Sequence, residues 1–304
     1  MTAAFTPHRR QFFIGPDQRP PVPGWSSRKL SGDRYLHHCP TLPVTDDGGQ
    51  IVMGPALRGG RDDPDGWGGR YVTIDGESLT TDTSSLLGVY TTAGEHGPVF
   101  SNSPSLMAAH SGASPVARRL AWYSLNWHPL PGSGRVGTTK LLPATSVDVT
   151  SGEQTLAPLP TPMEGSIDDR AAVLADSLTT QLESLADRPT VWVALTAGLD
   201  SRTVLAAALH SGCRVRTYTQ RFPSLSDTEL AVARAVADAA DVDHQIVELG
   251  RSSGAVRRDI GRHTDGETVD ADRYALARHG LGFAGPDEPI LRGGVFEYGR
   301  RFFA

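Results

Sequence analysis

The segment that most constrains the fold of this chain is VWVALTAGLDSRTVLAAALHSG, which begins at Val191. Val191–Thr196 is an almost unbroken apolar run, which is typical of a strand buried on both faces of a parallel sheet. Two small residues, Ala197 and Gly198, follow it, and Ser201–His210 has the composition of a helix. A buried strand that turns at once into a helix begins a strand–helix–strand unit, so the second half of the chain is predicted to be an α/β domain.

The alternation of strands and helices continues along this half of the chain. Further strands are predicted at Arg214–Thr219, His244–Leu249 and Pro289–Arg292, and helices at Ser166 to about Ala186, Asp227–Ala240 and Asp270–His279. Such an alternation predicts a doubly wound parallel sheet, whose ligands bind beyond the carboxyl ends of the strands. His244 opens a strand after an acidic turn, and we expect it to pack or to form hydrogen bonds.

The first half of the chain has a different pattern of predicted secondary structure. Short β-prone runs begin at Gln50, Arg70, Leu86, Pro98 and Thr145, and turn clusters separate them. We expect a mostly antiparallel β domain, with helices near Pro104–His110 and Pro115–Trp122. The Pro-rich stretch Leu156–Pro162 marks the expected boundary, which divides the chain into domains 1–160 and 161–304.

Composition excludes several classes of protein. No uncharged apolar run approaches the ~18 residues of a membrane span, and the start MTAAFTPHRRQFF lacks the apolar core of a signal peptide. The two cysteines, Cys39 and Cys213, can build neither a disulfide framework nor a four-cysteine zinc site. His37–Cys39 lacks a second pair of metal ligands, so we interpret it as a loop or strand edge. We therefore expect a cytoplasmic protein that binds no membrane.

Charge argues against nucleic acid as the main partner. The formal net charge is −5, and all of that excess lies in residues 161–304, which carry 16 basic and 21 acidic side chains. No basic face is large enough to bind a duplex, which also argues against an enzyme that modifies tRNA.

The turn Thr196–Ser201 carries the chemistry. Small residues let its N–H groups converge at a helix N-terminus, which favours binding of phosphate or pyrophosphate. The hydroxyls of Thr196 and Ser201 can reach the same anion. Asp200 would repel a bare phosphate, so its presence indicates a bridging Mg²⁺ ion, while Arg202 either neutralises phosphate or faces solvent. The alternative is an ordinary turn in which Asp and Ser cap a helix.

At these residues the sequence resembles the asparagine synthase family, whose ATP-pyrophosphatase (PP-loop) signature is SGGxDS. Gly198, Asp200 and Ser201 match it, while Thr196 and Ala197 replace Ser and Gly. RVRTYTQRF and DVDHQIVEL follow in the order found in that family, and LRGGVFEYGRRFF is similar to its second ATP-site loop. GWGGRYVTIDG, SNSPSLMAA, LAWYSLNWHPLP and TKLLPATSVDVTSG resemble its N-terminal half. The resemblance implies a glutaminase-like (Ntn-type) β domain followed by an ATP-pyrophosphatase domain.

The resemblance also implies a reaction and a set of residues. Such enzymes transfer AMP from ATP to a carboxylate, release pyrophosphate, and let an amine or ammonia attack the acyl-adenylate to form an amide. Asp200 and Arg202 would serve catalysis, and Asp200 with Glu297 would hold Mg²⁺, although Glu297 is equally consistent with a salt bridge to Arg300 or Arg301. The residues that would bind ATP are Leu195, Thr196, Ala197, Gly198, Leu199, Asp200, Ser201, Thr217 and Tyr218.

The sequence departs from the family pattern at three points. Thr2 stands where glutamine-hydrolysing members have a cysteine nucleophile, no lysine follows Lys140, and Gly294 replaces a glutamate of the second loop. Family members also continue for about another domain beyond that loop. We therefore expect either an amide-forming ligase or a noncatalytic, truncated nucleotide-binding homologue that acts with a partner subunit. Self-association into a homo-oligomer is a further possibility.

Overall fold

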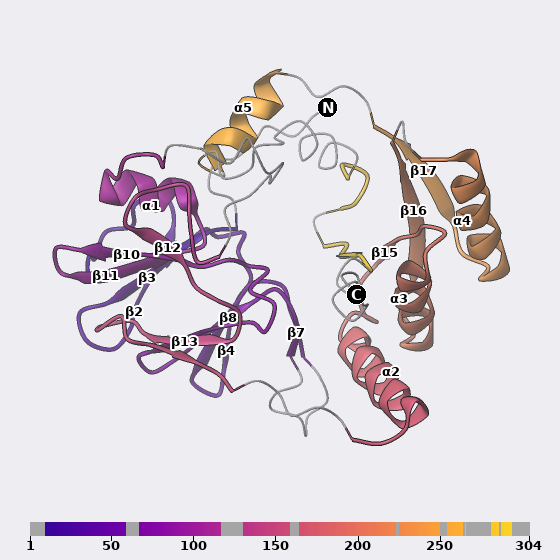
Figure 1. The fold of residues 1–304 in the computed structure, drawn as a ribbon, viewed down its shortest axis with the longest axis horizontal. Helices are drawn as coiled ribbons and strands as arrows, with labels where there is room; N and C mark the ends of the chain where they lie inside the picture. The colour runs from indigo at the N-terminus through magenta and orange to yellow at the C-terminus, as the bar shows by residue number, and fades with distance from the viewer. Residues whose placement is uncertain are drawn as a thin grey trace. The chain divides into compact units, whose positions relative to one another are not determined.

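The chain forms two compact units (Figure 1), each of which collects segments that are distant in sequence. The computed structural model describes residues 10–58, 67–116, 130–158, 164–222, 225–249, 254–263, 265, 281–285 and 287–293. The β-rich unit contains Met1–Ala56, Gly69–Pro160 and Ser253–Asp272. The α/β unit contains Leu57–Gly68, Thr161–Ser252 and Arg273–Ala304.

The β-rich unit contains two six-stranded antiparallel sheets, which confirms the strand type predicted for this half. The first has the order β12-β10-β11-β1-β3-β2, with β1 Phe12–Gly15, β2 Ser26–Lys29, β3 Tyr35–His38, β10 Tyr90–Gly94, β11 Gly97–Ser101 and β12 Thr138–Lys140. The second has the order β14-β13-β9-β8-β5-β4, with β4 Val44–Asp47, β5 Gln50–Met53, β8 Val72–Asp75, β9 Ser78–Thr81, β13 Thr145–Asp148 and β14 Gln154–Leu156.

One hydrophobic core joins the two sheets. Ile14, Leu36 and Phe100 enter it from the first sheet, and Met53 and Ile74 enter it from the second. All five side chains are at most 1% exposed. Because both sheets contribute to one cluster, they pack face to face, and burial of each large side chain stabilises the unit by about 1.5–3 kcal/mol.

Two helices complete the β-rich unit. Helix α1, Pro104–Ser111, begins where Ser103 Oγ accepts a hydrogen bond from Leu106 N, and it ends at Gly112 with a φ of 60°. It confirms the helix predicted at Pro104–His110 and packs against β10 and β11. Helix α5, Gly254–His263, contacts α1.

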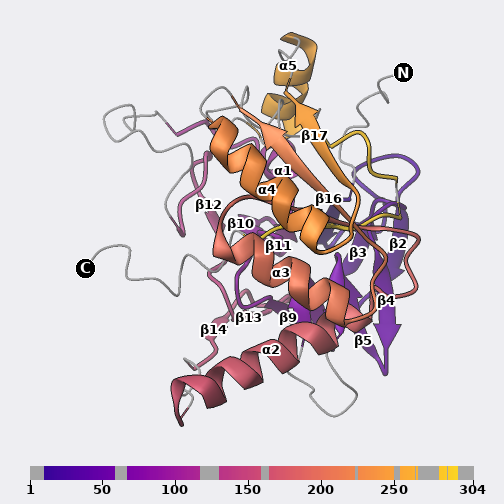
Figure 2. The same cartoon turned by 90° about the vertical axis from the view of Figure 1, so that its right-hand side faces the viewer.

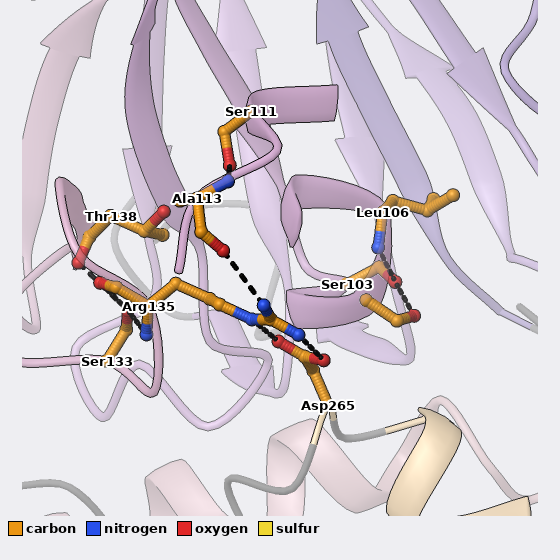
Figure 3. A network of polar contacts seen from close by, with 9 residues as sticks. Ser103, Leu106, Ser111, Ala113, Ser133, Arg135, Thr138 and Asp265 are labelled. Atoms are coloured by element: carbon orange, nitrogen blue, oxygen red, sulfur yellow. Dashed lines mark hydrogen bonds and ion pairs between the residues drawn. The ribbon is translucent and has the colours of Figure 1, made fainter. Parts of the chain in front are cut away.

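The helix predicted at Pro115–Trp122 lies mostly outside the described residues, and Pro115 itself forms a β-bridge with Arg135. Arg135 also forms a two-fold ion pair with Asp265, just beyond α5 (Figure 3).

The α/β unit has a four-stranded parallel sheet, as predicted, with the order β17-β16-β15-β18. Its strands are β15 Val191–Ala194, β16 Val215–Arg221, β17 His244–Glu248 and β18 Ile290–Leu291. Its helices are α2 Ile167–Glu183, α3 Leu199–His210 and α4 Asp227–Ala239. Helices α3 and α4 cover the same face of the sheet, and α2 packs against α3 (Figures 1 and 2). The helix predicted at Asp270–His279 lies outside the described residues.

Local sequence explains where these helices begin. Ser166 and Asp169 form the predicted capping box at α2, and Ser226 and Glu229 form a second one at α4. Strands β6, Ala56–Arg58, and β7, Trp67–Gly69, form a two-stranded sheet, and Leu57 packs against the hydrophobic core of the α/β unit. No helix in the described part of the chain is both long and apolar enough to cross a membrane.

Candidate functional site

Strand order places one turn at a special position in the α/β unit. β15 lies between β16 and β18, so successive strands run from β15 toward β17 on one side, and the chain returns to add β18 on the other. In open parallel sheets, the point where the order reverses is where ligands bind, beyond the carboxyl ends of the strands. The turn Thr196–Gly198, which joins β15 to α3, stands at that edge.

Ser201 holds this turn in shape from within. Its side chain is only 4% exposed, and Oγ accepts a hydrogen bond from Thr196 N at 3.1 Å. The same oxygen lies 3.2 Å from the carbonyl oxygen of Thr196 and 3.1 Å from that of Gly198. Thr196 Oγ1 completes the network, because it lies 3.0 Å from Ser201 Oγ and accepts a bond from Gly198 N at 3.1 Å. The two hydroxyls therefore hold the turn in its observed shape.

The N-terminus of α3 differs from those of α1, α2 and α4. Those three helices begin at Ser103, Ser166 and Ser226, whose side chains cap them. Helix α3 begins at Gly198 and has no side-chain cap hydrogen bond. Its first N–H groups and the positive end of its dipole therefore remain suited to an anion. Leu199, 66% exposed, leaves the first turn open to solvent.

Arg202 has a role that the sequence did not indicate. Its Nε donates to the carbonyl oxygen of Gly198 at 3.3 Å, and its Nη2 donates to that of Ala197 at 3.2 Å. The guanidinium thus braces the turn by satisfying two of its carbonyl groups. This contact also orients the turn. In each peptide unit whose carbonyl oxygen accepts a hydrogen bond from Arg202, the N–H points in the opposite direction, away from the guanidinium.

The loop that follows β18 lies directly against the start of α3. A Cβ added to Gly293 would lie 2.7 Å from the carbonyl carbon of Asp200 and 2.8 Å from the amide nitrogen of Ser201. Main chain therefore packs on main chain between the loops that follow two adjacent parallel strands. Gly294 and Glu297 lie outside the described residues, as does Thr2.

Three of the residues predicted to bind ATP, Leu195, Thr217 and Tyr218, are buried, and their side chains point in different directions. Leu195 is fully buried in the core shared with α2 and α3. Thr217 is also fully buried, and its Oγ1 donates to the carbonyl oxygen of Asp243 at 3.0 Å and lies 2.8 Å from His244 Nδ1. This confirms a hydrogen-bonding role for His244, whose pKa is lowered chiefly by burial.

Tyr218 occupies the opposite face of the sheet, because successive residues of a strand alternate. Its ring lies 5.0 Å from that of Phe283, and Phe283 also contacts Trp192 edge-on at 4.5 Å. Burial raises the pKa of Tyr218, while nearby Arg292 opposes the shift. Glu288 accepts a hydrogen bond from Trp192 Nε1 at 2.8 Å and anchors this layer.

Among the described residues, Asp200 supplies the one carboxylate of the turn Thr196–Ser201. Asp200 is half-buried in the first turn of α3. No group of three or more His, Cys, Asp or Glu side chains in the described part of the chain could hold a metal ion. Both cysteines are free and buried. His37 and His38 end β3, which lies between β1 and β2, whereas the sequence predicted a loop or strand edge for His37–Cys39.

Comparison with known proteins finds similarity over part of the chain. One solved structure that resembles this chain is the glutamine-dependent NAD+ synthetase from Acinetobacter baumannii in complex with adenosine diphosphate, at 17% identity. That similarity covers 48% of this chain and 27% of the synthetase, with a TM-score of 0.28, which is too low to support an argument. No curated protein matches. The asparagine synthase family model matches residues 170–279, a region that includes most of α2, all of α3, α4 and α5, and strands β15–β17. Over this segment, about a third of the chain, the sequence is similar to the asparagine synthase family.

Proposed function

We propose that the α/β unit binds ATP with Mg²⁺ at the start of α3, and that the chain is an ATP-dependent ligase that forms an amide through an acyl-adenylate. The observation that carries the proposal is the uncapped N-terminus of α3, which stands where the strand order reverses and against which Gly293 packs. The match of residues 170–279 to a family of such ligases supports the same reading.

The turn Thr196–Ser201 would hold the pyrophosphate portion of ATP. N–H groups of Ala197, Leu199 and Asp200 lie at the start of α3, where the helix dipole favours negative charge. Arg202 would act on the phosphates through the turn, since its donors bind the carbonyl groups of Ala197 and Gly198. These groups are already in place before ligand binds, so the charge of the leaving pyrophosphate would be stabilised with little rearrangement.

Asp200 would be the protein's ligand for Mg²⁺ at this turn, with Glu297 of the second loop as its proposed partner. One or two carboxylates suit Mg²⁺ in nucleotide sites, because phosphate oxygens and water complete its shell. The ion would neutralise the charge that develops on the phosphates. The single carboxylate of the described turn fits a metal that arrives with the nucleotide.

The proposed reaction has two displacements. A carboxylate oxygen of the substrate attacks the α-phosphorus, and the bond to pyrophosphate breaks. An amine or ammonia then attacks the acyl carbon, loses a proton, and AMP leaves. Leu195, Thr217 and Tyr218 are proposed to border the adenine. Because their side chains are buried, that contact would use the main chain at the end of β15, where Ala194 pairs with Tyr218 of β16.

The remaining assignments complete the proposal. Residues 161–304 would carry the ATP chemistry, and residues 1–160 would form the glutaminase-like domain, without an N-terminal cysteine. The ATP requirement favours a cytoplasmic location. The second candidate function is a noncatalytic, nucleotide-binding homologue that acts with a partner subunit. The absence of lysine from residues 161–304 favours this candidate. Self-association into a homo-oligomer is a separate proposal.

Two measurements test the proposal. Calorimetry with ATP and Mg²⁺ tests binding, and ATP–pyrophosphate exchange with a panel of carboxylates tests adenylation. We expect the wild-type chain to bind ATP and to exchange pyrophosphate with at least one carboxylate. Asp200→Asn should abolish exchange, whereas Asp187→Asn, in an exposed turn, should not.

Each other result has a definite meaning. Binding without exchange for any carboxylate would favour the noncatalytic candidate. If ATP does not bind, or if Asp200→Asn and Asp187→Asn behave alike, the site assignment is wrong.

A further inference from the structure

A second pocket lies within the β-rich unit and is unrelated to the turn described above. It has a volume of about 640 Å³, within the range of small-molecule sites. Its lining includes Gln18, Asp33, Arg34, Tyr35, His96 and Thr150. Gly15 pairs with Tyr35, and Ile14 pairs with Phe100. The turn after β1 and the turns before β3 and β11 therefore lie at the same end of the first sheet.

Arg34 is the unusual member of this lining. It is only 5% exposed, although its side chain is charged. Nη2 donates to the carbonyl oxygen of Thr150 at 3.1 Å, but Nη1 is buried and has no hydrogen-bond partner. Within the described part of the chain, no carboxylate forms an ion pair with Arg34. A buried guanidinium normally has such a partner, since desolvation without one is costly.

The backbone is shaped to receive this guanidinium. Gly97 has a φ of +101°, and a Cβ at that position would lie 2.1 Å from Arg34 Nη2. No larger residue could therefore stand at position 97 while Arg34 keeps its place. The Thr150 carbonyl and the Gly97 main chain thus hold the guanidinium at the pocket, where no described carboxylate forms an ion pair with it.

Asp33 limits which ligand can balance that charge. It lies in the same lining and is exposed. Its carboxylate would repel a dianion more strongly than a monoanion, and it would attract a cationic group on the same ligand. Charge-assisted hydrogen bonds from arginine best fit planar or tetrahedral oxyanions.

We propose that this pocket binds a small, singly charged oxyanion through Arg34. The ligand's oxygens would pair with the Arg34 guanidinium, as a protein carboxylate does with most buried arginines. The inference is independent of the proposed ATP site, because every lining residue belongs to the β-rich unit.

Acetate and acetamide provide a matched pair of probes, since they share a shape and differ in charge. Each is titrated into the intact, isotope-labelled chain, and the backbone amide signals of Gly97 and Thr150 are followed by NMR. Acetate should shift these signals saturably, and acetamide should not. Inorganic phosphate, at a pH where it is mainly singly charged, distinguishes a phosphate ligand from a carboxylate ligand. Saturable, Arg34-dependent binding of either anion supports the proposal.

Three variants make the test specific. Arg34→Gln should weaken binding at least about tenfold, because charged hydrogen bonds are lost. Asp33→Asn should strengthen it roughly two- to fivefold, because a nearby negative charge is removed. Arg28→Gln, at an exposed arginine of β2 that pairs with Asp46 at 2.8 Å, is the control and should change nothing.

The proposal is overturned if acetate and phosphate cause no saturable shift, which would mean that the pocket holds only water. Equal responses to acetate and acetamide would overturn it as well. If Arg34→Gln fails to fold, the affinity of Asp33→Asn for acetate becomes the test. An affinity equal to that of the wild type would contradict the proposal.

Discussion

Gly293 and Asp200 lie so close that a methyl group at position 293 would fall 2.7 Å from the carbonyl carbon of Asp200 and 2.9 Å from its carbonyl oxygen. The two residues lie 93 positions apart in the sequence and follow neighbouring parallel strands, β18 and β15. A contact between side chains could adjust to a substitution. This contact joins main-chain atoms, which cannot move aside without displacing the turn. The contact therefore ties the position of the second loop to the start of α3.

Gly293→Ala should consequently damage the ATP site more than the fold. The added methyl must push the start of α3 away, and misplacement of binding groups by about 1 Å can reduce function by one to two orders of magnitude. We expect the affinity for ATP with Mg²⁺, measured by calorimetry, to fall at least about tenfold. Gly261→Ala is the control, because nothing lies within 4 Å of the added atom. Equal affinities in the two variants would show that the contact does not position the site.

Ser201→Ala should destabilise the α/β unit itself. The substitution removes the hydroxyl that binds Thr196 N and leaves buried polar groups of the turn without a partner. Loss of such a group costs about 1–3 kcal/mol in the free energy of unfolding. Urea denaturation would measure the cost. Thr203→Ala, at an exposed hydroxyl two residues along the helix, should change stability by less than about 0.5 kcal/mol. A similar effect of both substitutions would contradict the assigned role of Ser201.

His37 should make the β-rich unit less stable in mild acid. It is fully buried, with Nδ1 2.8 Å from Ser27 Oγ and Nε2 2.8 Å from the carbonyl oxygen of Asp17, and burial lowers its pKa below the usual 6.5. Below pH 6.5 the unfolded chain binds a proton that the folded chain resists, so stability falls as pH drops from 6.5 toward the folded-state pKa. Above pH 6.5 this contribution is fully present.

Urea midpoints at several pH values between 5 and 8 would test this dependence. His37→Gln should lower the midpoint at pH 7.5 and flatten its dependence on pH below 6.5. The same slope in the variant and the wild type would assign the pH dependence to another group. His244 has a pKa lowered in the same direction, so the α/β unit should lose stability in the same pH range.

Arg135 and Asp265 form a two-fold ion pair within the β-rich unit (Figure 3). Nε and Nη2 of Arg135 meet the two carboxylate oxygens at 2.5 and 2.6 Å, and Nη1 donates to the carbonyl oxygen of Ala113. The two side chains are only 23% and 15% exposed. Removal of either partner therefore leaves a poorly solvated charge, and we expect Arg135→Gln or Asp265→Asn to cost about 2 kcal/mol.

A double-mutant cycle would measure the coupling between these two residues. The pair of substitutions should cost less than the sum of the single ones, because the second removes the charge left by the first. Hydrogen exchange in α5, which ends two residues before Asp265, should accelerate in each single variant. Strict additivity would mean that the ion pair contributes nothing to stability.

Elements with a clear local pattern were predictable from the sequence. Val191–Ala194 is apolar throughout because helices α2 and α3 and residues 281–285 bury both of its faces, and the parallel sheet follows from its alternation with helices. Strand β2, Ser26–Lys29, shows the opposite case. Its four residues are exposed because it lies at the edge of its sheet, so no hydrophobic period marks it.

The candidate site was predictable only in its local part. The sequence located the turn at Thr196–Ser201, because small residues between a buried strand and a helix are a local signal. It could not show that Arg202 binds the carbonyls of Ala197 and Gly198, since that depends on the rotamer and on the curve of the turn. The contact of Gly293 with Asp200 depends on strand order, which no local pattern encodes. Burial of Thr217 and Tyr218 on opposite faces follows from their alternation along β16.

The central claim is that N–H groups at the start of α3 bind the pyrophosphate portion of ATP. The most direct measurement is an NMR titration of the isotope-labelled chain with pyrophosphate and Mg²⁺, in which every assigned backbone amide is followed. The largest shifts are expected at Ala197, Leu199 and Asp200, they should saturate together, and they should disappear in Gly293→Ala. Shifts confined to other parts of the chain, or no saturable shift at these three amides, would contradict the claim.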